Sequence, residues 1–459
     1  MAATGYRSQS GHVRRLSNVE ASHTDIISGP NVVVPPKYLM ARSDAYETAK
    51  AIELAKHHLE EEVSSPEATP RAASPIPEHP ATTTDRYAFA FDIDGVLVRG
   101  GKAIPAAIEA LKILNGQNEY GIKVYVALIL LIFLTLTLTV PFFSSPYIFV
   151  TNGGGKTEEE RCLDLSRQLE YEVSPGQFIC GHTPMREMAE KYNTVLVVGG
   201  EGEKCRQVAE GYGFKDVVTP GDIIKYNRHT TPFRQLTDEE LQNSRSRDFS
   251  DVVIDAIFVF ADSRDWAGDQ QIILDLCMSK GGRIGTRSDT FDEGPPVYFS
   301  HNDIVWSTSH EHTRIGMGAL RASVEALFKA VAGKELRTIA FGKPQLGTFQ
   351  FATRLLQQWR KETHGIDSPP ATVYFVGDTP ESDIRGTNEY NESDLSENLW
   401  YSILVKTGVF QEGTVPRFPP KKICEDVLAA VKFGMKREHL NTLKQSGTNE
   451  EVQGANAIS

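Results

Sequence analysis

Short runs of apolar residues, each followed by polar ones, divide much of the chain into predicted strands. Residues 86–91 (RYAFAF), 147–150 (YIFV) and 372–377 (TVYFVG) are predominantly apolar, and a segment with helical spacing follows the first of them at 106–114. Continuous apolar runs of roughly four to eight residues are typical of parallel strands buried on both faces. The alternation of strand and helix therefore predicts an α/β fold with a parallel sheet.

A second set of strand and helix patterns lies between residues 180 and 333. Its predicted strands and helices, in chain order, are 194–200, 204–211, 256–260, 269–279 and 297–306. Residues 227–249 are polar and rich in turn formers, so we expect a surface loop there. The pattern predicts a second α/β domain over 180–333, inserted between the two halves of the first domain, 86–179 and 334–435.

Both ends of the chain differ in composition from this interior. Residues 1–85 and 436–459 contain too few large apolar residues to pack, although 44–62 could form one helix. Residues 1–19 carry arginine and serine and no acidic residue, as mitochondrial presequences do, but they show no apolar stripe. A targeting-like, disordered N-terminal region and a disordered tail are the predictions, and cleavage of a presequence stays open.

One apolar run does not fit the α/β pattern. Residues 125–143 form a 19-residue stretch without charge, which is long enough to cross a bilayer. It lies between the helix at 106–114 and the strand at 147–150, where a connection of roughly 2–6 residues is usual. Removing 125–145 would restore such a connection, so we interpret the segment as a translated intron. A genuine membrane anchor and a buried hairpin stay open.

Charge and cysteine content limit the partners. The net charge is −12 and no long basic run interrupts it, which argues against a nucleic-acid partner and favours a small molecule. The five cysteines are odd in number, widely scattered and without a Cys-x-x-Cys pair. This pattern indicates a reducing compartment. The oligomeric state is not indicated.

Two carboxylates follow the first strand at once. Asp92 and Asp94 stand beyond the carboxyl end of 86–91, where ligands bind in open α/β sheets. One carboxylate at this spacing can attack an electrophile while the other protonates a leaving oxygen. A helix N-cap pair, or a metal clamp of the Asp-x-Asp kind that holds nucleotide sugars, would give the same motif.

Three further groups of polar residues follow later apolar runs. Residues 151–153 (TNG) could hold phosphoryl oxygens through a hydroxyl and backbone amides. Lys343, in Gly-Lys-Pro, could offset the charge of a phosphate, although a lone lysine is usually a solvated surface residue. Asp378 and Asp383 offer hard oxygen ligands that suit Mg²⁺, or alternatively an acidic turn that caps the next helix.

The four motifs together, Asp-x-Asp-Gly, Thr-Asn, Gly-Lys-Pro and Gly-Asp-x-x-x-x-Asp, resemble those of the haloacid dehalogenase (HAD) superfamily of aspartate-nucleophile phosphatases. Their spacing is similar to that of subfamily IIA, which has a large α/β cap of the C2 type between the second and third motifs, and within it to the cat-eye-syndrome-critical-region group of mitochondrial hydrolases. The resemblance covers about residues 86–432. It implies a Rossmann-like HAD core with a parallel sheet, an inserted C2 cap, and Mg²⁺-dependent hydrolysis of a small phosphorylated metabolite.

The resemblance also implies roles for individual residues. Asp92 would attack phosphorus and form an aspartyl phosphate, Asp94 would act as acid and then as base, and Lys343 would complete the catalytic set. The implied metal-binding residues are Asp92, Asp94 (through its backbone carbonyl), Asp378 and, in a supporting position, Asp383. The implied phosphate-binding residues are Thr151, Asn152, Gly153 and Lys343.

Weaker signals complete the sequence-based expectations. Residues 310–312 (HEH) could suggest a metal site, 262–266 could contact substrate, and Asn302 and Asp303 would return near the core by analogy with the family. A phosphotransferase and a non-catalytic scaffold are the alternative functions. The resemblance implies a mitochondrial location, with the cytoplasm as alternative, and substrates related to glycerophospholipids. Membrane attachment is expected only if 125–143 is a genuine span.

Overall fold

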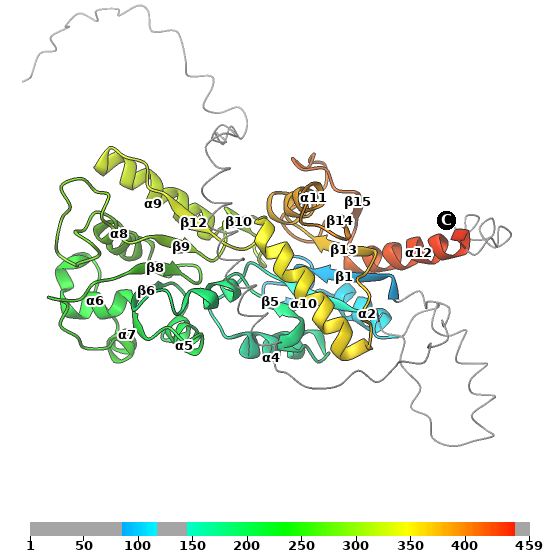
Figure 1. Cartoon of the computed structure of the whole chain (residues 1–459), viewed down its shortest axis with the longest axis horizontal. Coiled ribbons are helices and arrows are strands. Elements are labelled where there is room, and N and C mark those ends of the chain that lie inside the picture. The colour runs from blue at the N-terminus through cyan, green and yellow to red at the C-terminus, as the bar shows by residue number, and fades with distance from the viewer. Residues whose placement is uncertain (1–84, 117–144, 446–459) are drawn as a thin grey trace, which may run out of the picture. The chain divides into compact units, whose positions relative to one another are not determined.

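The protein is represented by a computed structural model that describes residues 85–116 and 145–445. The predicted helix at 44–62 and the apolar run at 125–143 lie outside the described residues. Within these ranges, no helix combines the length and the apolar character needed to cross a membrane. Figure 1 shows two main sheets with helices around each of them.

The first sheet has six parallel strands in the order β15-β14-β13-β1-β4-β5. Its strands are β1 (Tyr87–Phe91), β4 (Tyr147–Val150), β5 (Phe178–Ile179), β13 (Thr372–Gly377), β14 (Leu399–Val405) and β15 (Lys422–Cys424). Its helices are α2 (Pro105–Leu114), α4 (Glu158–Leu169), α10 (Leu346–His364), α11 (Arg385–Glu392) and α12 (Val427–Gln445). The predicted parallel core is confirmed.

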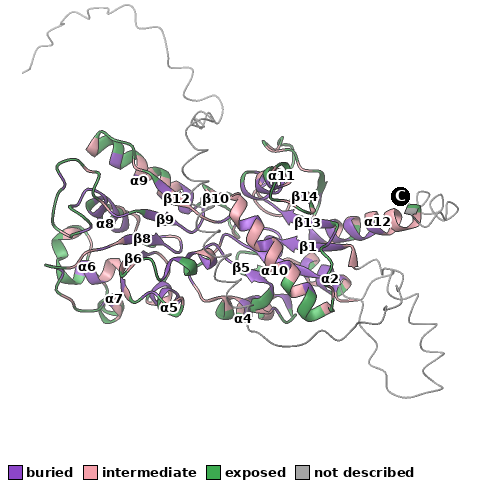
Figure 2. Ribbon diagram, viewed as in Figure 1, coloured by how far each residue is buried: buried purple, intermediate pink, exposed green. Residues whose placement is uncertain are grey.

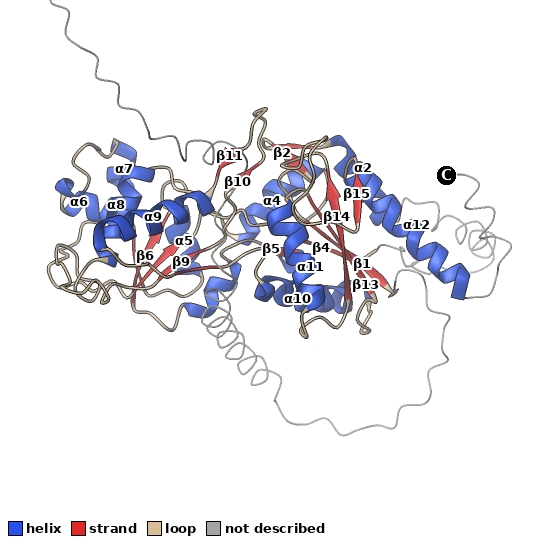
Figure 3. Cartoon of the chain, turned by 90° about the horizontal axis from the view of Figure 1, so that it is seen from above, coloured by secondary structure: helices blue, strands red, loops and turns tan. Residues whose placement is uncertain are grey.

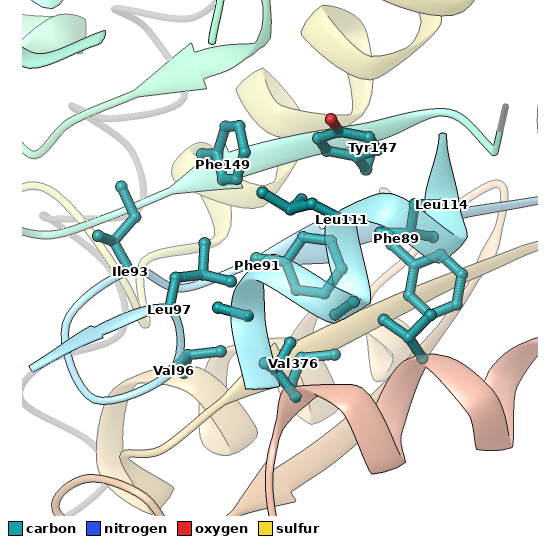
Figure 4. Packing of buried hydrophobic residues seen from close by; sticks show 14 of the residues in the cluster. Phe89, Phe91, Ile93, Val96, Leu97, Leu111, Leu114, Tyr147, Phe149 and Val376 are labelled. Carbon is teal, nitrogen blue, oxygen red and sulfur yellow. The ribbon is translucent and has the colours of Figure 1, made fainter. Parts of the chain in front are cut away.

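The residues of β1 alternate between two helical layers. Phe89 and Phe91 pack on the side of α2, α4 and α12, whereas Ala88 and Ala90 pack on the side of α10 and α11. Figure 4 shows Phe89 and Phe91 near Leu111 of α2, and Figure 2 shows the central strands buried. Because both faces are covered, the strand must be apolar at every position, as the sequence pattern indicated.

The second sheet has five parallel strands in the order β12-β9-β8-β6-β7. Its strands are β6 (Thr194–Val198), β7 (Asp216–Val218), β8 (Ala256–Val259), β9 (Val297–Phe299) and β12 (Thr338–Ala340). Its helices are α5 (Lys204–Gly211), α6 (Pro220–Tyr226), α7 (Asp238–Asn243), α8 (Trp266–Cys277) and α9 (Met317–Ala332), labelled in Figures 1 and 3. The second α/β unit is therefore present.

Several shorter strands and helices complete the described part of the fold. Two small sheets pair β2 (Val98–Arg99) with β3 (Lys102–Ala103) and β10 (Val305–Trp306) with β11 (Arg314–Ile315). The short helices are η2 (Pro175–Gln177), η3 (Thr183–Met188), η4 (Arg228–Thr230) and η5 (Pro380–Ile384). Figure 3 shows β10 and β11 between the labelled elements of the two main sheets.

Three features differ from the sequence-based expectations. The tail predicted to be disordered from residue 436 begins within α12, which continues to Gln445 and buries Glu438. The loop predicted at 227–249 contains η4 and α7, because Thr237 and Glu240 form a capping box that starts a helix in a polar segment. The strand before Lys343, expected in the second half of the first domain, is β12, which pairs with β9 in the second sheet. That sheet thus extends past residue 333, while the domain boundaries themselves stay predictions.

Candidate active site

Three neighbouring strands of the first sheet end at the same edge. Phe91, the last residue of β1, is in register with Val376 of β13 on one side and with Phe149 of β4 on the other. The residues that follow these strands, Asp92 and Thr151, and Asp378 at the end of β13, are all buried. Parallel pairing thus brings together segments that lie far apart in the sequence, at the edge where open α/β sheets bind ligands.

Lys343 joins two of the carboxylates. Its Nζ lies 2.6 Å from Oδ1 of Asp92 and 2.7 Å from Oδ1 of Asp383. One carboxylate oxygen from each of Asp92, Asp378 and Asp383 lies within 4.8 Å of the other two. The cluster therefore contains three buried carboxylates and one ammonium group, and the carboxylates outnumber the positive charge.

The protonation equilibria reflect this imbalance. Burial raises the pKa of Asp92 well above its usual range, and the neighbouring Asp383 and Asp378 raise it further while Lys343 opposes them. Burial, with the charge of Asp383, raises the pKa of Asp378 to about 7. Burial alone would lower the pKa of Lys343, but Asp383 and Asp92 raise it above its usual value. A divalent cation with oxygen ligands fits this donor set, because it would supply the missing charge.

The carboxylate of Asp378 lies in a close backbone cradle. Its Oδ2 accepts a hydrogen bond from the backbone N of Val409 at 2.6 Å. A Cβ atom added to Gly408 would lie 1.8 Å from this oxygen, and one added to Gly95 would lie 2.2 Å from it. Gly95 also has a φ of +88°, which L side chains rarely adopt. Glycine at both positions is what allows the carboxylate to lie there.

Asp383 connects the strand end to the lysine. Its Oδ2 accepts hydrogen bonds from the backbone N atoms of Asp378 and Thr379, both at 3.0 Å. Its Oδ1 faces Lys343. Asp383 is fully buried, so one carboxylate shapes the turn after β13 and orients the lysine at the same time.

The side chain of Asn152 is committed to protein groups. Its Oδ1 accepts from the backbone N of Lys343 at 2.8 Å, and its Nδ2 donates to the backbone carbonyl of Lys343 at 3.0 Å and to Oδ2 of Asp303 at 2.9 Å. Its acceptor and both of its amide protons are therefore used. Asp303 lies against the core, as family analogy predicted, and only the backbone of Asn152 is left for a ligand.

Thr151 and Asp94 complete the predicted set, in different surroundings. Oγ1 of Thr151 accepts from the backbone N of Gly153 at 3.0 Å, which leaves the hydroxyl proton for another acceptor. The carboxylate of Asp94 is outside the group of three and faces Arg161, with 3.8 Å between Oδ2 and a guanidinium nitrogen. Burial raises the pKa of Asp94, while Arg161 and Lys343 lower it.

A second cluster was not predicted from the sequence. Ligand atoms of Glu158, Cys180 and His182 lie within 4.8 Å of one another, but Tyr212 donates to Oε1 of Glu158 at 2.6 Å and lies 2.7 Å from Nδ1 of His182. Burial raises the pKa of the Cys180 thiol and lowers that of His182 to about 4. Because these groups satisfy one another and the thiol stays protonated, we interpret the cluster as structural.

Within the described residues, neither of the two weaker sequence signals contributes a ligand atom to the group of Asp92, Asp378 and Asp383. Residues 310–312 are exposed and belong to neither potential ligand cluster of the described residues. Asp262 follows β8, and its backbone carbonyl accepts from the backbone N of Gly200 at 3.1 Å and from Arg264 at 2.8 Å. A contact between 262–266 and substrate stays a prediction.

Comparisons with known proteins identify families and proteins that this chain is similar to. A profile described as haloacid dehalogenase-like hydrolase matches residues 89–215, and one described as HAD-hydrolase-like matches 340–430. A mitochondrial hydrolase of Saccharomyces cerevisiae is 38% identical over 76% of this chain and 96% of its own length. A cardiolipin synthase (CMP-forming)/mitochondrial hydrolase fusion protein of Schizosaccharomyces pombe is 36% identical over 80% of this chain, and the match spans 56% of that protein. A hypothetical protein of Pyrococcus horikoshii OT3 aligns over 76% of this chain and 99% of its own with a TM-score of 0.46 and 19% identity.

A doubly covered parallel sheet with carboxylates at its carboxyl edge and an inserted second α/β unit is the architecture of a capped hydrolase with a Rossmann-like core. The chain belongs to the haloacid dehalogenase-like hydrolases. The resemblance stated from the four motifs is therefore confirmed, as are the HAD core with its cap and the prediction of an enzyme. The arrangement around Asp92 and Lys343 is the candidate active site of this hydrolase.

Proposed function

We propose that the protein is a Mg²⁺-dependent phosphatase that cleaves a small phosphate monoester through an aspartyl phosphate on Asp92. The observation that carries the proposal is the buried group in which Lys343 lies between Asp92 and Asp383, with Asp378 beside them. This group combines a nucleophile, a fixed cation and ligands for a hard metal ion.

The residues divide the chemistry between them. Asp92 attacks phosphorus, while Lys343 and the Thr151 hydroxyl bind the oxygens of the transferring group together with the backbone amides of 152–153. Asp94 protonates the leaving oxygen and then takes a proton from the attacking water. Its pKa, raised by burial, makes the protonated form accessible for the first step. Water is the final acceptor, and Asp92 is regenerated.

The metal-binding groups would be the carboxylates of Asp92 and Asp378 and the backbone carbonyl of Asp94. Asp383 would support them through its contacts with the backbone of Asp378 and with Lys343. Bound Mg²⁺ would neutralise phosphoryl and carboxylate charge in this buried site. Lys343 already offsets one of the three carboxylates, and burial, together with the neighbouring carboxylates, raises the pKa values of Asp92 and Asp378. The second α/β unit, predicted at 180–333, would close over the site and select the leaving group.

Location and metabolic context come from the relatives. Both of the yeast relatives described above carry the term mitochondrial hydrolase in their names, and we propose a mitochondrial location for this chain. The fission-yeast protein also contains a cardiolipin synthase, which supports a substrate from glycerophospholipid metabolism. The matched region spans 56% of that protein, so the synthase activity itself is not proposed here.

Phosphate release from a panel of monoesters, with and without Mg²⁺, tests the proposal. The full chain and a variant lacking 125–145 are compared, and each is measured with and without Asp92→Asn. Asp269→Asn is the control, since Asp269 is a buried aspartate of α8 outside the site. We expect Mg²⁺-dependent release that Asp92→Asn abolishes and the control retains. Release that survives Asp92→Asn would exclude the aspartyl-phosphate mechanism.

A further inference from the structure

We propose that Arg161 binds a second anionic group of the substrate, so that the preferred substrates are phosphate monoesters whose leaving group carries a carboxylate or another phosphate. The inference rests on the proposed phosphatase function and deepens it to a substrate class. It starts from the position of one guanidinium group beside Asp94.

Arg161 lies on the side of the site where the leaving group would be. It belongs to α4, the helix that follows the turn after Thr151, and a guanidinium nitrogen lies 3.8 Å from Oδ2 of Asp94. An ideal Cβ on Gly153 would lie 3.5 Å from the same oxygen, so the phosphate-binding turn and Arg161 flank Asp94 together. Asp94 is the residue assigned to the leaving oxygen, and a group attached to that oxygen therefore comes close to Arg161.

The guanidinium of Arg161 keeps its donors for a ligand. The 3.8 Å separation from Asp94 is too long for a hydrogen bond, and no other side-chain hydrogen bond is made by Arg161 within the described part of the chain. Nearby cations are engaged: Lys156 pairs with Asp164 at 2.5 Å, and Arg264 donates to the carbonyl of Asp262 at 2.8 Å.

Partial burial makes this position effective for anions. The side chain of Arg161 is 25% exposed, so it is reachable from solvent and yet surrounded by protein that weakens screening. A guanidinium presents a planar fork of donors that matches carboxylate and phosphate oxygens. Arg206 and Arg247 show the alternative in this protein, since each makes two hydrogen bonds to one aspartate.

The competing explanation is that Arg161 serves only as an electrostatic partner of Asp94. In that case its loss would affect alkyl phosphates alike, whatever their charge, because Asp94 protonates each alkoxide leaving group, whereas p-nitrophenolate leaves without a proton. A role in binding the substrate predicts instead a loss that depends on the charge of the leaving group.

The experiment compares leaving groups in the full-length protein. The substrates are p-nitrophenyl phosphate and glycerol phosphate, whose leaving groups are uncharged, and phosphoglycolate and a short diol bisphosphate, whose leaving groups carry a carboxylate or a phosphate. The variants are Arg161→Met and, as control, Arg167→Met, since Arg167 lies on the same helix with an exposed side chain. The kcat/KM is measured for each protein with each substrate at saturating Mg²⁺.

We expect the wild-type protein to prefer at least one anionic substrate, and Arg161→Met to lower kcat/KM for it by roughly 30- to 100-fold more than for glycerol phosphate, as for a lost charge-assisted hydrogen bond. Arg167→Met should change neither. The anionic substrate whose kcat/KM falls further in Arg161→Met shows whether Arg161 binds a carboxylate or a phosphate. A wild-type protein that cleaves all four alike, or a loss in Arg161→Met that is as large for glycerol phosphate as for the anionic substrates, would overturn this inference alone. Absence of hydrolysis of every phosphate ester would overturn the proposed function as well.

Discussion

Asn152 and Lys343 hydrogen-bond to each other in both directions, at 2.8 Å and 3.0 Å, although they follow strands of different sheets. The side-chain amide of Asn152 holds the backbone N and the carbonyl of Lys343, and Asp303 accepts the remaining amide proton. Gly342 makes this approach possible, because a Cβ atom there would lie 2.6 Å from the amide oxygen of Asn152. The direction in which Lys343 reaches Asp92 is therefore fixed by a residue that precedes it by 191 positions.

Asn152→Ala should lower kcat more than it raises KM. The variant removes three hydrogen bonds and leaves the buried carbonyl of Lys343 without its partner, which costs about 1–3 kcal/mol, or roughly 10- to 100-fold in rate if it appears in the transition state. Asp303→Asn retains an oxygen that can accept the hydrogen bond from Asn152, so its kcat should fall much less than that of Asp303→Ala. Steady-state kinetics beside thermal melts separate this from unfolding. Equal kcat in Asn152→Ala and wild type would contradict the positioning role.

The sequence was sufficient to predict the strand ends but not this contact. Apolar runs such as 147–150 and 372–377 identify buried parallel strands, and their carboxyl ends predict where Asp378 and Thr151 lie. The expectation that residues 151–153 bind phosphate did not include the contact between the Asn152 side chain and Lys343, because pairing of an amide with a distant backbone has no local signature. The assignment of β12 to the second sheet was missed for the same reason.

Gly408→Ala should weaken Mg²⁺ binding without unfolding the protein. The added Cβ would lie 1.8 Å from Oδ2 of Asp378, so the carboxylate must move away from its present position and from the backbone N of Val409. We expect the Kd for Mg²⁺ to rise about tenfold or more, as for a displaced ligand or a lost supporting contact. Calorimetric titration measures it.

The matched control for this prediction is Gly211→Ala. Gly211 ends α5, and a Cβ atom there meets no atom within 4 Å. Its Mg²⁺ affinity should equal that of the wild-type protein. Unchanged affinity in Gly408→Ala as well would mean that Asp378 is not a metal ligand.

The cradle of Asp378 and the position of Arg161 lay beyond sequence reasoning. Gly408 stands in an ordinary Thr-Gly-Val segment, and Arg161 is one of several charged residues at the start of a helix. Both become informative only when folding brings them beside Asp378 and Asp94. Close approach is a property of tertiary packing, and neither spacing nor composition records it.

Arg206→Met should destabilise the second α/β unit. Arg206 and Asp222 are both buried, and the guanidinium donates to each carboxylate oxygen of Asp222 at 2.8 Å. Removing the arginine leaves a buried carboxylate without its cation, which typically costs about 3–5 kcal/mol. Denaturant unfolding measures the loss. The double variant Arg206→Met with Asp222→Leu should recover part of the lost free energy of unfolding. A loss in the double variant equal to the sum of the losses in the two single variants would contradict the coupling.

His182 should make the protein sensitive to mild acid. It is completely buried, against Tyr212, Glu158 and Cys180, and burial lowers its pKa from 6.5 to about 4 although Glu158 opposes the change. The unfolded chain therefore binds a proton between these two pH values that the folded chain does not. The stability that depends on neutral His182 is complete above pH 6.5 and is lost as the pH falls toward 4, by about 1–3 kcal/mol.

His182→Gln tests this origin of acid sensitivity, because glutamine cannot take up a proton in that range. The variant should be less stable than the wild-type protein at pH 7.5, where it loses packing and the contact to Tyr212, yet its free energy of unfolding should fall less between pH 7 and pH 5. His310→Gln, an exposed change, should leave the pH dependence as in the wild type. Urea unfolding across this range gives all three slopes. If His182→Gln and the wild type lose stability in parallel, the acid sensitivity arises from other groups, because a residue that cannot titrate contributes no proton linkage.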